Sequence, residues 1–379
     1  MKASPASQIG LSERSPAPPA RGRQLLRHYA WRRLPWVMGF ALFGLTLPAW
    51  VAAVPAGWAW ARLWGDLDLH WQQWHALGGA SAALAMLALA RRWPDRAAAR
   101  RRVRRVGLAL AIGAALLAAN LSGFVLPRLP AATAAGEVLR LVSFNVNLGN
   151  TDQAPIVDWV RQTDPDVLAL LEVTPDMTEL LGALGQRYPH AQLRPTDDGF
   201  GMAVFSRLPL ADGRWGRDPG GMPTFTAQLC LPDGLAVALY VLHPMPPVNA
   251  HYLAARDALF RSLPPAEPGA LPTSGGLVMG DLNATAWTPA LRALGDAGWA
   301  RATSLRPTWG VGVALPIDHI LATQAHWRRV RSGVGPALKS DHLPVWAEVG
   351  RTVQGHGGKA VPPPKDAACA AAAVTGSAP

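Results

Sequence analysis

Cysteine is scarce in this chain of 379 residues, which holds Cys230 and Cys369 and no other. Two cysteines exclude a scaffold held together by a framework of disulfides. Cys230 lies in a strand-like run and Cys369 in a tail rich in Gly, Pro and Ala, so we expect no disulfide between them. Cysteine usage therefore gives no information about the compartment of the protein.

Positive charge is lacking in the larger part of the chain. Residues 137–379 contain 19 Lys and Arg against 21 Asp and Glu, whereas residues 1–136 contain 17 against 4. The net charge of +11 therefore comes from the N-terminal part. A protein that holds nucleic acid tightly usually carries a basic surface. The composition excludes such a surface as a bulk property of the residues after 136.

Long hydrophobic runs are present in the N-terminal part. Residues 34–54 form an uncharged apolar stretch, and residues 71–90 and 106–126 are two further candidates for membrane spans. About 20 apolar residues cross a bilayer as a helix, and tryptophan gathers at the ends of such spans, as it does here. A cleaved signal peptide is the alternative for the first stretch, but two more stretches follow it. We expect a membrane anchor of about three transmembrane helices in residues 34–126.

The distribution of arginine predicts the orientation of this anchor. Residues 1–33 are basic and residues 91–105 hold eight Arg and one Asp, whereas the loop between the first two stretches holds Arg62 with two Asp. The positive-inside rule then places both Arg-rich segments in the cytoplasm. We therefore expect a multi-pass protein of the inner (plasma) membrane whose residues after 126 are extracytoplasmic.

The rest of the chain divides into a linker at 127–137, one domain at 138–351 and a disordered tail at 352–379. Within the domain, strand-like and helix-like patterns alternate, which predicts an α/β fold of sheets covered by helices. The expected strands are 138–146, 167–172, 201–206, 224–231, 235–243, 277–281, 317–322 and 343–349, and the expected helices are 155–162, 176–186, 249–262 and 289–297.

Polar residues end one apolar strand after another. These residues are Asn145, Glu172, His243, Asp281 with Asn283, Asp318, and Asp341 with His342. Side chains two apart on a strand share a face, so Asp281 and Asn283 point to the same side. If the strand ends converge, they supply carboxylates for a hard cation such as Mg²⁺, amides for phosphate oxygens and histidines for proton transfer.

This series of motifs resembles the endonuclease/exonuclease/phosphatase superfamily, whose fold is that of pancreatic DNase. The resemblance covers residues 138–350 in the right order, and it is strongest to bacterial members with a few membrane spans before the catalytic domain. It implies a four-layer α/β/β/α sandwich of two packed mixed sheets.

The resemblance also implies a metal site for Mg²⁺, or Mn²⁺ in its place. Glu172 matches the principal metal ligand, Asp341 matches the acid that closes the metal site, and Asn145 matches the active-site Asn beside it. Asn147 stands where many members have Asp, which weakens any second metal contact there.

The remaining matches imply the catalytic roles. Asp281 and Asn283 match the pair that aligns the nucleophile and binds phosphate. Asp318 matches the carboxylate that orients the catalytic histidine, which is His342, and His243 matches a second acid of the DNase-like branch. The side chain of His319 points to the opposite strand face from that of Asp318, so we expect it to pack in the core.

We therefore expect metal-assisted hydrolysis of a phosphodiester by water, with a His–Asp dyad and without a covalent intermediate. The substrate is nucleic acid or a lipid headgroup, and no stable protein partner can be inferred. A phosphomonoesterase of the same fold and a non-catalytic membrane scaffold are the alternatives. The presence of all the acids and both histidines argues against the scaffold.

Reporter fusions after Gly136 test the predicted orientation. Because three spans would precede this point, an alkaline-phosphatase fusion should be exported and active, and a cytoplasmic reporter fused at the same residue should be inactive. The reverse pattern would contradict an extracytoplasmic domain.

Overall fold

The computed structural model describes residues 58–91, 97–123, 125–132, 138–266, 271, 274–310, 314–352 and 369. The first expected span, 34–54, lies outside these residues, as does nearly all of the expected disordered tail. Within the domain at 138–351, each strand and helix expected from the sequence is found within a few residues of its expected bounds, whereas the helix over the third expected span begins earlier, at Ala97.

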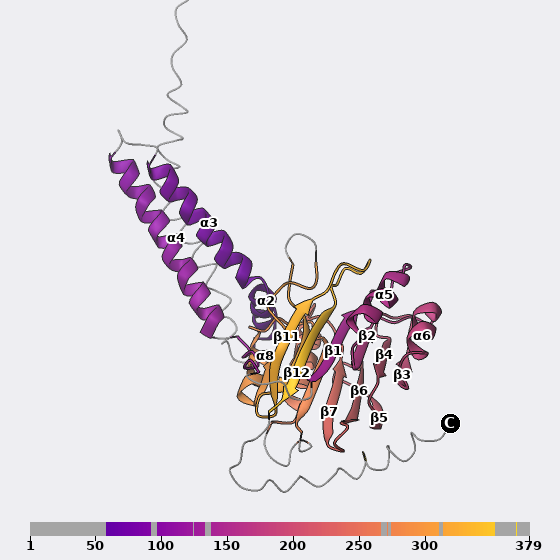
Figure 1. The fold of residues 1–379 in the computed structure, drawn as a ribbon. Helices are drawn as coiled ribbons and strands as arrows, with labels where there is room; N and C mark the ends of the chain where they lie inside the picture. The colour runs from indigo at the N-terminus through magenta and orange to yellow at the C-terminus, as the bar shows by residue number, and fades with distance from the viewer. Residues whose placement is uncertain are drawn as a thin grey trace, which may run out of the picture.

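Two six-stranded mixed sheets form the centre of the molecule (Figure 1). In spatial order, the first sheet consists of β11 (Trp327–Val334), β12 (Val345–Arg351), β1 (Val138–Asn145), β2 (Val167–Leu171), β4 (Met202–Ser206) and β3 (His190–Arg194). The second consists of β5 (Leu210–Arg217), β6 (Pro223–Cys230), β7 (Ala236–Leu242), β8 (Gly276–Asp281), β10 (Asp318–Thr323) and β9 (Trp299–Arg301).

Each sheet has one parallel pair of strands at its centre, β1 with β2 and β7 with β8, and its other neighbours are antiparallel. Parallel neighbours end at the same edge of a sheet, and they require a crossover connection. Helix α5 (Ala154–Thr163) makes that crossover in the first sheet, and α7 (Ala250–Ser262) makes it in the second. The two halves of the sandwich therefore repeat one arrangement.

Three apolar cores hold the layers together. One lies between the sheets and contains, for example, Leu141 from the first sheet and Leu239 from the second. A second core joins the second sheet to α7 and α8 (Pro289–Asp296), through residues such as Phe260 and Leu291. A third joins the first sheet to α5 and α6 (Thr178–Gly185). The layer order is therefore α/β/β/α, as expected.

Two helices of the outer layers begin at residues that favour the start of a helix. The side chain of Asn249 accepts a hydrogen bond of 2.9 Å from the backbone N–H of Tyr252 at the start of α7. Pro289 stands in the first turn of α8, where its missing N–H costs no helical hydrogen bond. Local sequence thus sets the starts of two helices that cover the second sheet.

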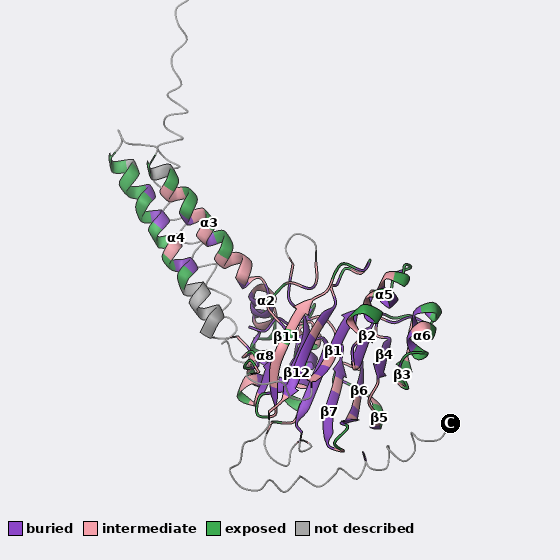
Figure 2. Cartoon of the chain, viewed as in Figure 1, coloured by how far each residue is buried: buried purple, intermediate pink, exposed green. Residues whose placement is uncertain are grey.

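Among the described residues, three helices precede the sandwich: α2 (Ala59–Leu69), α3 (Gln72–Arg91) and α4 (Ala97–Gly123). Helices α3 and α4 pack side by side and project away from the sheets, with many exposed residues along both (Figures 1 and 2). The second and third expected spans fall on these two helices. Among the helices that the structure describes, none has the length and apolar character needed to cross a bilayer.

Cys230 and Cys369 form a disulfide, so the expectation of two unpaired cysteines was wrong. Cys230 ends β6, and both cysteines are buried in a small cluster with Ala211 and Ala236. The two residues are 139 positions apart, and the composition of a tail does not reveal which strand it returns to.

Candidate active site

The parallel pair of the first sheet brings two of the predicted residues to one edge. Asn145 is the last residue of β1 and is in register with Leu171, the last residue of β2, so Glu172 follows beside it. Glu172 has a φ of 60°, a left-handed conformation that costs energy for a residue with a side chain. Its Oε1 accepts a hydrogen bond of 2.7 Å from Nδ2 of Asn145, and its Oε2 accepts one of 3.1 Å from the backbone of Leu148.

The parallel pair of the second sheet does the same for His243 and Asp281. A side chain at Gly280 would place its Cβ 1.9 Å from the backbone oxygen of Leu242, so this close approach of β7 and β8 requires glycine. His243 follows β7, and its Nε2 lies 3.6 Å from Oδ2 of Asp281 at the end of β8.

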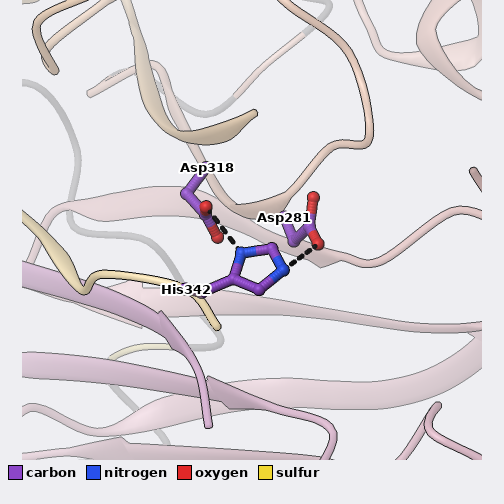
Figure 3. Close-up of side chains that lie close together, drawn as sticks. All are labelled: Asp281, Asp318 and His342. Carbon is purple, nitrogen blue, oxygen red and sulfur yellow. Dashed lines mark hydrogen bonds and ion pairs between the residues drawn. The ribbon is translucent and has the colours of Figure 1, made fainter. Parts of the chain in front are cut away.

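Asp318 and His342 complete the centre of the site (Figure 3). Asp318 begins β10 and is the antiparallel partner of Asp281, so the two carboxylates are neighbours. Nδ1 of His342 lies 2.9 Å from Oδ2 of Asp318, and its Nε2 lies 3.6 Å from Oδ2 of Asp281. One imidazole thus lies between two buried carboxylates.

The charges of this trio are strongly coupled. Burial lowers the pKa of His342, but Asp318 and Asp281 outweigh burial and raise it to about 10. Burial raises the pKa of Asp281, but His342 and His243 outweigh it and lower the pKa to about 2. Burial raises the pKa of Asp318 above its ordinary value. At neutral pH the site therefore holds an imidazolium beside an ionised Asp281.

Asn145 connects the two sheets at the site. Besides its bond to Glu172, its Nδ2 lies 3.3 Å from Oδ2 of Asp281 and 3.4 Å from Nε2 of His342. Its backbone oxygen accepts a hydrogen bond of 2.8 Å from the hydroxyl of Ser340. Ser340 was not predicted as a site residue. Its hydroxyl also accepts a hydrogen bond from the backbone N–H of His342 and so fixes the segment that carries the histidine.

Asp341 is held by two side chains. Its Oδ1 accepts a hydrogen bond of 2.6 Å from Nδ2 of Asn147, and its Oδ2 accepts one of 3.0 Å from Nε1 of Trp309. Asn147 therefore orients a predicted metal ligand through its amide. The sequence offered no signal for Trp309, which lies 32 positions before its partner.

Asn283 is positioned by a residue that the sequence analysis also missed. Its backbone N–H donates to Oδ1 of Asp281 at 2.9 Å, and its backbone oxygen accepts a bond of 3.0 Å from Nη1 of Arg256 on α7. Arg256 is completely buried, and its Nη2 lies 2.9 Å from Oδ2 of Asp66 on α2. An ion pair thus connects the helix before the sandwich to the loop that carries Asn283.

The predicted site residues meet around one cavity of about 550 Å³. Glu172, His243, Asp281, Asn283, Asp341 and His342 line it, and Asn145 and Asp318 bond to residues that line it. Asp281, Asp318 and His342 form a possible metal site, because they offer ligand atoms within 4.8 Å of one another. Carboxylates, an amide and histidines therefore face the same cavity.

His319 lies away from this cavity. Its ring is fully buried, and its Nε2 lies 2.9 Å from the backbone oxygen of Ala284. Burial lowers the pKa of His319 to about 4, so the ring is neutral at pH 7 and donates from Nε2.

Comparison with known proteins identifies the family. Residues 142–342 match the model of the endonuclease/exonuclease/phosphatase family. The chain belongs to this family. It is a hydrolase that acts on phosphoester bonds. Among curated protein sequences, none matches this chain.

Several solved structures have a similar fold at low sequence identity. An endonuclease/exonuclease/phosphatase from Beutenbergia cavernae is 19% identical over 56% of this chain and 72% of its own, with a TM-score of 0.45. The human Nocturnin catalytic domain is 16% identical over 57% and 95%, with a TM-score of 0.46. A 3′ phosphatase from Neisseria, solved with a product DNA hairpin, is 18% identical over 55% and 98%, with a TM-score of 0.44.

The dyad can be tested in this family member by mutation. His342→Ala should lower kcat/KM for bis-p-nitrophenyl phosphate by about 10²–10⁴-fold, the range for groups that transfer or hold a proton. Asp318→Asn should lose a sizeable part of this, because the amide no longer stabilises the imidazolium. The double variant should lose little more than His342→Ala, since the two residues act as one unit. Fully additive losses would contradict the dyad.

His319 predicts a specific loss of stability in acid. Its folded pKa of about 4 lies below its unfolded value of 6.5, so the unfolded chain binds a proton that the folded chain does not. The stabilisation is therefore present above pH 6.5 and is lost as the pH falls toward 4, by about 3 kcal/mol. Urea titrations at pH 7 and pH 4.5 should show a smaller change in the free energy of unfolding for His319→Gln than for the unmodified protein. An equal change would show that His319 is not responsible.

Proposed function

We propose that the protein is a magnesium-dependent phosphodiesterase in which water is the nucleophile. The observation that carries this is the single cavity onto which Glu172, Asp281, Asp341, His243 and His342 all open. A phosphoryl group in such a cavity meets both acceptors for the water and donors for its own oxygens. This combination suits direct hydrolysis, in which no residue is modified.

Glu172 and Asp341 are the proposed metal ligands, with Asn145 beside them. Nδ2 of Asn145 faces Glu172, and its Oδ1 accepts a hydrogen bond of 3.0 Å from the backbone N–H of Asn147. Within the described part of the chain, neither acid forms an ion pair with Lys or Arg, whereas Asp281 has two histidines beside it. Two carboxylates at one cavity that have no Lys or Arg paired with them among the described residues fit a hard divalent cation, which prefers oxygen ligands. When bound, Mg²⁺ would polarise the phosphoryl oxygen and offset charge on the leaving oxygen.

The other side chains around the cavity have separate roles in the reaction. Asp281 stays ionised because of its low pKa, so it can accept a hydrogen bond from the attacking water and align it. The imidazolium of His342, held by Asp318, donates toward the phosphoryl oxygens as negative charge builds, together with Asn283 and His243. The water oxygen bonds to phosphorus, one P–O ester bond breaks, and the alcohol leaves with a proton.

We also propose that a membrane anchor holds this domain on the outer side of the inner membrane. Arginine distribution favours this orientation, as argued from the sequence. The Cys230–Cys369 disulfide supports it, because disulfides persist in oxidising compartments and are rare in the cytosol. Exposed apolar side chains on the α3–α4 pair, such as Leu84 and Ile112, support contact with lipid.

Metal dependence tests the proposed function. The full chain should hydrolyse bis-p-nitrophenyl phosphate with Mg²⁺ or Mn²⁺, and Glu172→Gln should lose most of this activity while melting at a similar temperature. Glu179→Gln makes the same chemical change at an exposed position of α6, outside the cavity, and should keep full activity. Full activity in excess EDTA would exclude a metal-dependent reaction.

A further inference from the structure

Apolar side chains form the cavity wall around the groups that act on phosphate. Leu67, Trp71, Phe200, Met245, Val248 and Ile317 line it together with the catalytic residues. Val248 is 64% exposed, so this apolar wall reaches the mouth of the cavity. Among the described residues that line the cavity, none is Lys or Arg.

This lining disfavours a polyanionic substrate. A nucleic acid presents a phosphate at every nucleotide, and proteins bind the neighbouring phosphates with Lys and Arg. Here the catalytic groups can handle the phosphate that reacts, but the cavity walls offer no basic side chain for the next one. A substrate with one phosphate and an uncharged apolar group beside it matches the walls.

The apolar wall continues along α2. Trp60, Trp64 and Leu67 are spaced four and three residues apart, so they share one face of the helix, and Trp71 follows just beyond its end. Trp60 and Trp64 are 63% and 66% exposed, whereas Leu67 and Trp71 line the cavity. An apolar stripe therefore runs from the solvent-exposed surface of α2 into the cavity.

Helix α2 is fixed in this position by contacts with the sandwich. Asp66 pairs with the buried Arg256, and the backbone oxygen of Leu69 accepts a hydrogen bond from Nε1 of Trp287. Helix α2 leads directly into α3, which projects from the sandwich with α4 (Figure 1). Exposed tryptophans on a helix next to a helix pair with exposed apolar side chains, such as Leu84 and Ile112, suit the interface of a lipid surface.

We propose that the substrate is a lipid phosphoester, with one phosphate at the catalytic groups and its hydrocarbon part against Leu67, Trp71 and Val248. This assignment rests on the proposed function and names its substrate class. The stripe on α2 gives the hydrocarbon part a continuous apolar path from a lipid surface to the cavity.

Two diesters with the same leaving group test the assignment. The full chain in mild detergent with Mg²⁺ is assayed on methyl p-nitrophenyl phosphate and octyl p-nitrophenyl phosphate, which differ only in the retained alkyl group. We expect kcat/KM for the octyl ester to exceed that for the methyl ester by at least about tenfold. Val248→Ser and Trp71→Ala should each reduce this ratio several-fold. Partitioning of the octyl ester into detergent is the same for every variant, so a change in the ratio reports on the cavity.

Leu193→Ser is the matched control, because Leu193 is 44% exposed on β3 and does not line the cavity. It should leave both rates and their ratio unchanged. A ratio near one in the unmodified protein, or one that neither wall variant lowers, would overturn the lipid assignment while leaving phosphodiester hydrolysis in place. Faster cleavage of a single-stranded oligonucleotide than of the octyl ester would do the same. Failure to hydrolyse any of the three substrates with Mg²⁺ would overturn the proposed function as well.

Discussion

The contact between His342 and Asp318 joins the two sheets where they converge on the cavity. His342 lies just before β12 of the first sheet and Asp318 begins β10 of the second, with 2.9 Å between Nδ1 and Oδ2. Between the sheets the core is apolar, and apolar packing alone tolerates small shifts in how two faces meet. A buried charged pair does not tolerate such shifts, because a shift that separates the two partners leaves a buried charge unpaired. The pair therefore specifies how the sheet edges face each other, and Asn145 reinforces it through Asp281. His342 and Asp318 therefore have two roles: they act on phosphate, and they fix the relative position of the two sheet edges that carry them.

The sequence predicts the interior of each sheet and misses its edges. The four strands that were not expected, β3, β5, β9 and β11, are the outermost strands of the two sheets. Interior strands are covered on both faces and read as continuous apolar runs, which is why β2 and β8 are evident. Edge strands meet solvent and carry the residues that discourage further pairing, such as the three arginines and the glycine of β11. These residues hide the strand pattern.

The site residues could be predicted from the sequence where a polar residue that can take part in the reaction stands at the end of an apolar strand. Glu172, Asp281 and Asp318 each interrupt an apolar run, so a single position reveals them. Residues that act through partners distant in the sequence leave no such trace. Arg256 lies 190 positions from Asp66, and on α7 it reads as an ordinary solvent-facing arginine. The Cys230–Cys369 disulfide was missed for the same reason, since pairing depends on where the chain returns and composition does not encode that.

The segment before the sandwich is part of the catalytic unit as well as its expected tether. Asp66 and Asp257 both pair with Arg256, which holds the backbone of Asn283. Leu67 and Trp71 form part of the cavity wall. Without Asp66, the buried Arg256 keeps its ion pair of 3.0 Å with Asp257 but loses the pair of 2.9 Å with Asp66, and the loss of a buried charge partner is destabilising. A domain that begins at Val138 would therefore keep Glu172, Asp318 and His342 but would weaken the support of Asn283 and lose Leu67 and Trp71 from the cavity wall. Helix α2 and the active site consequently depend on one another, and a substitution in α2 is expected to change the loop that carries Asn283.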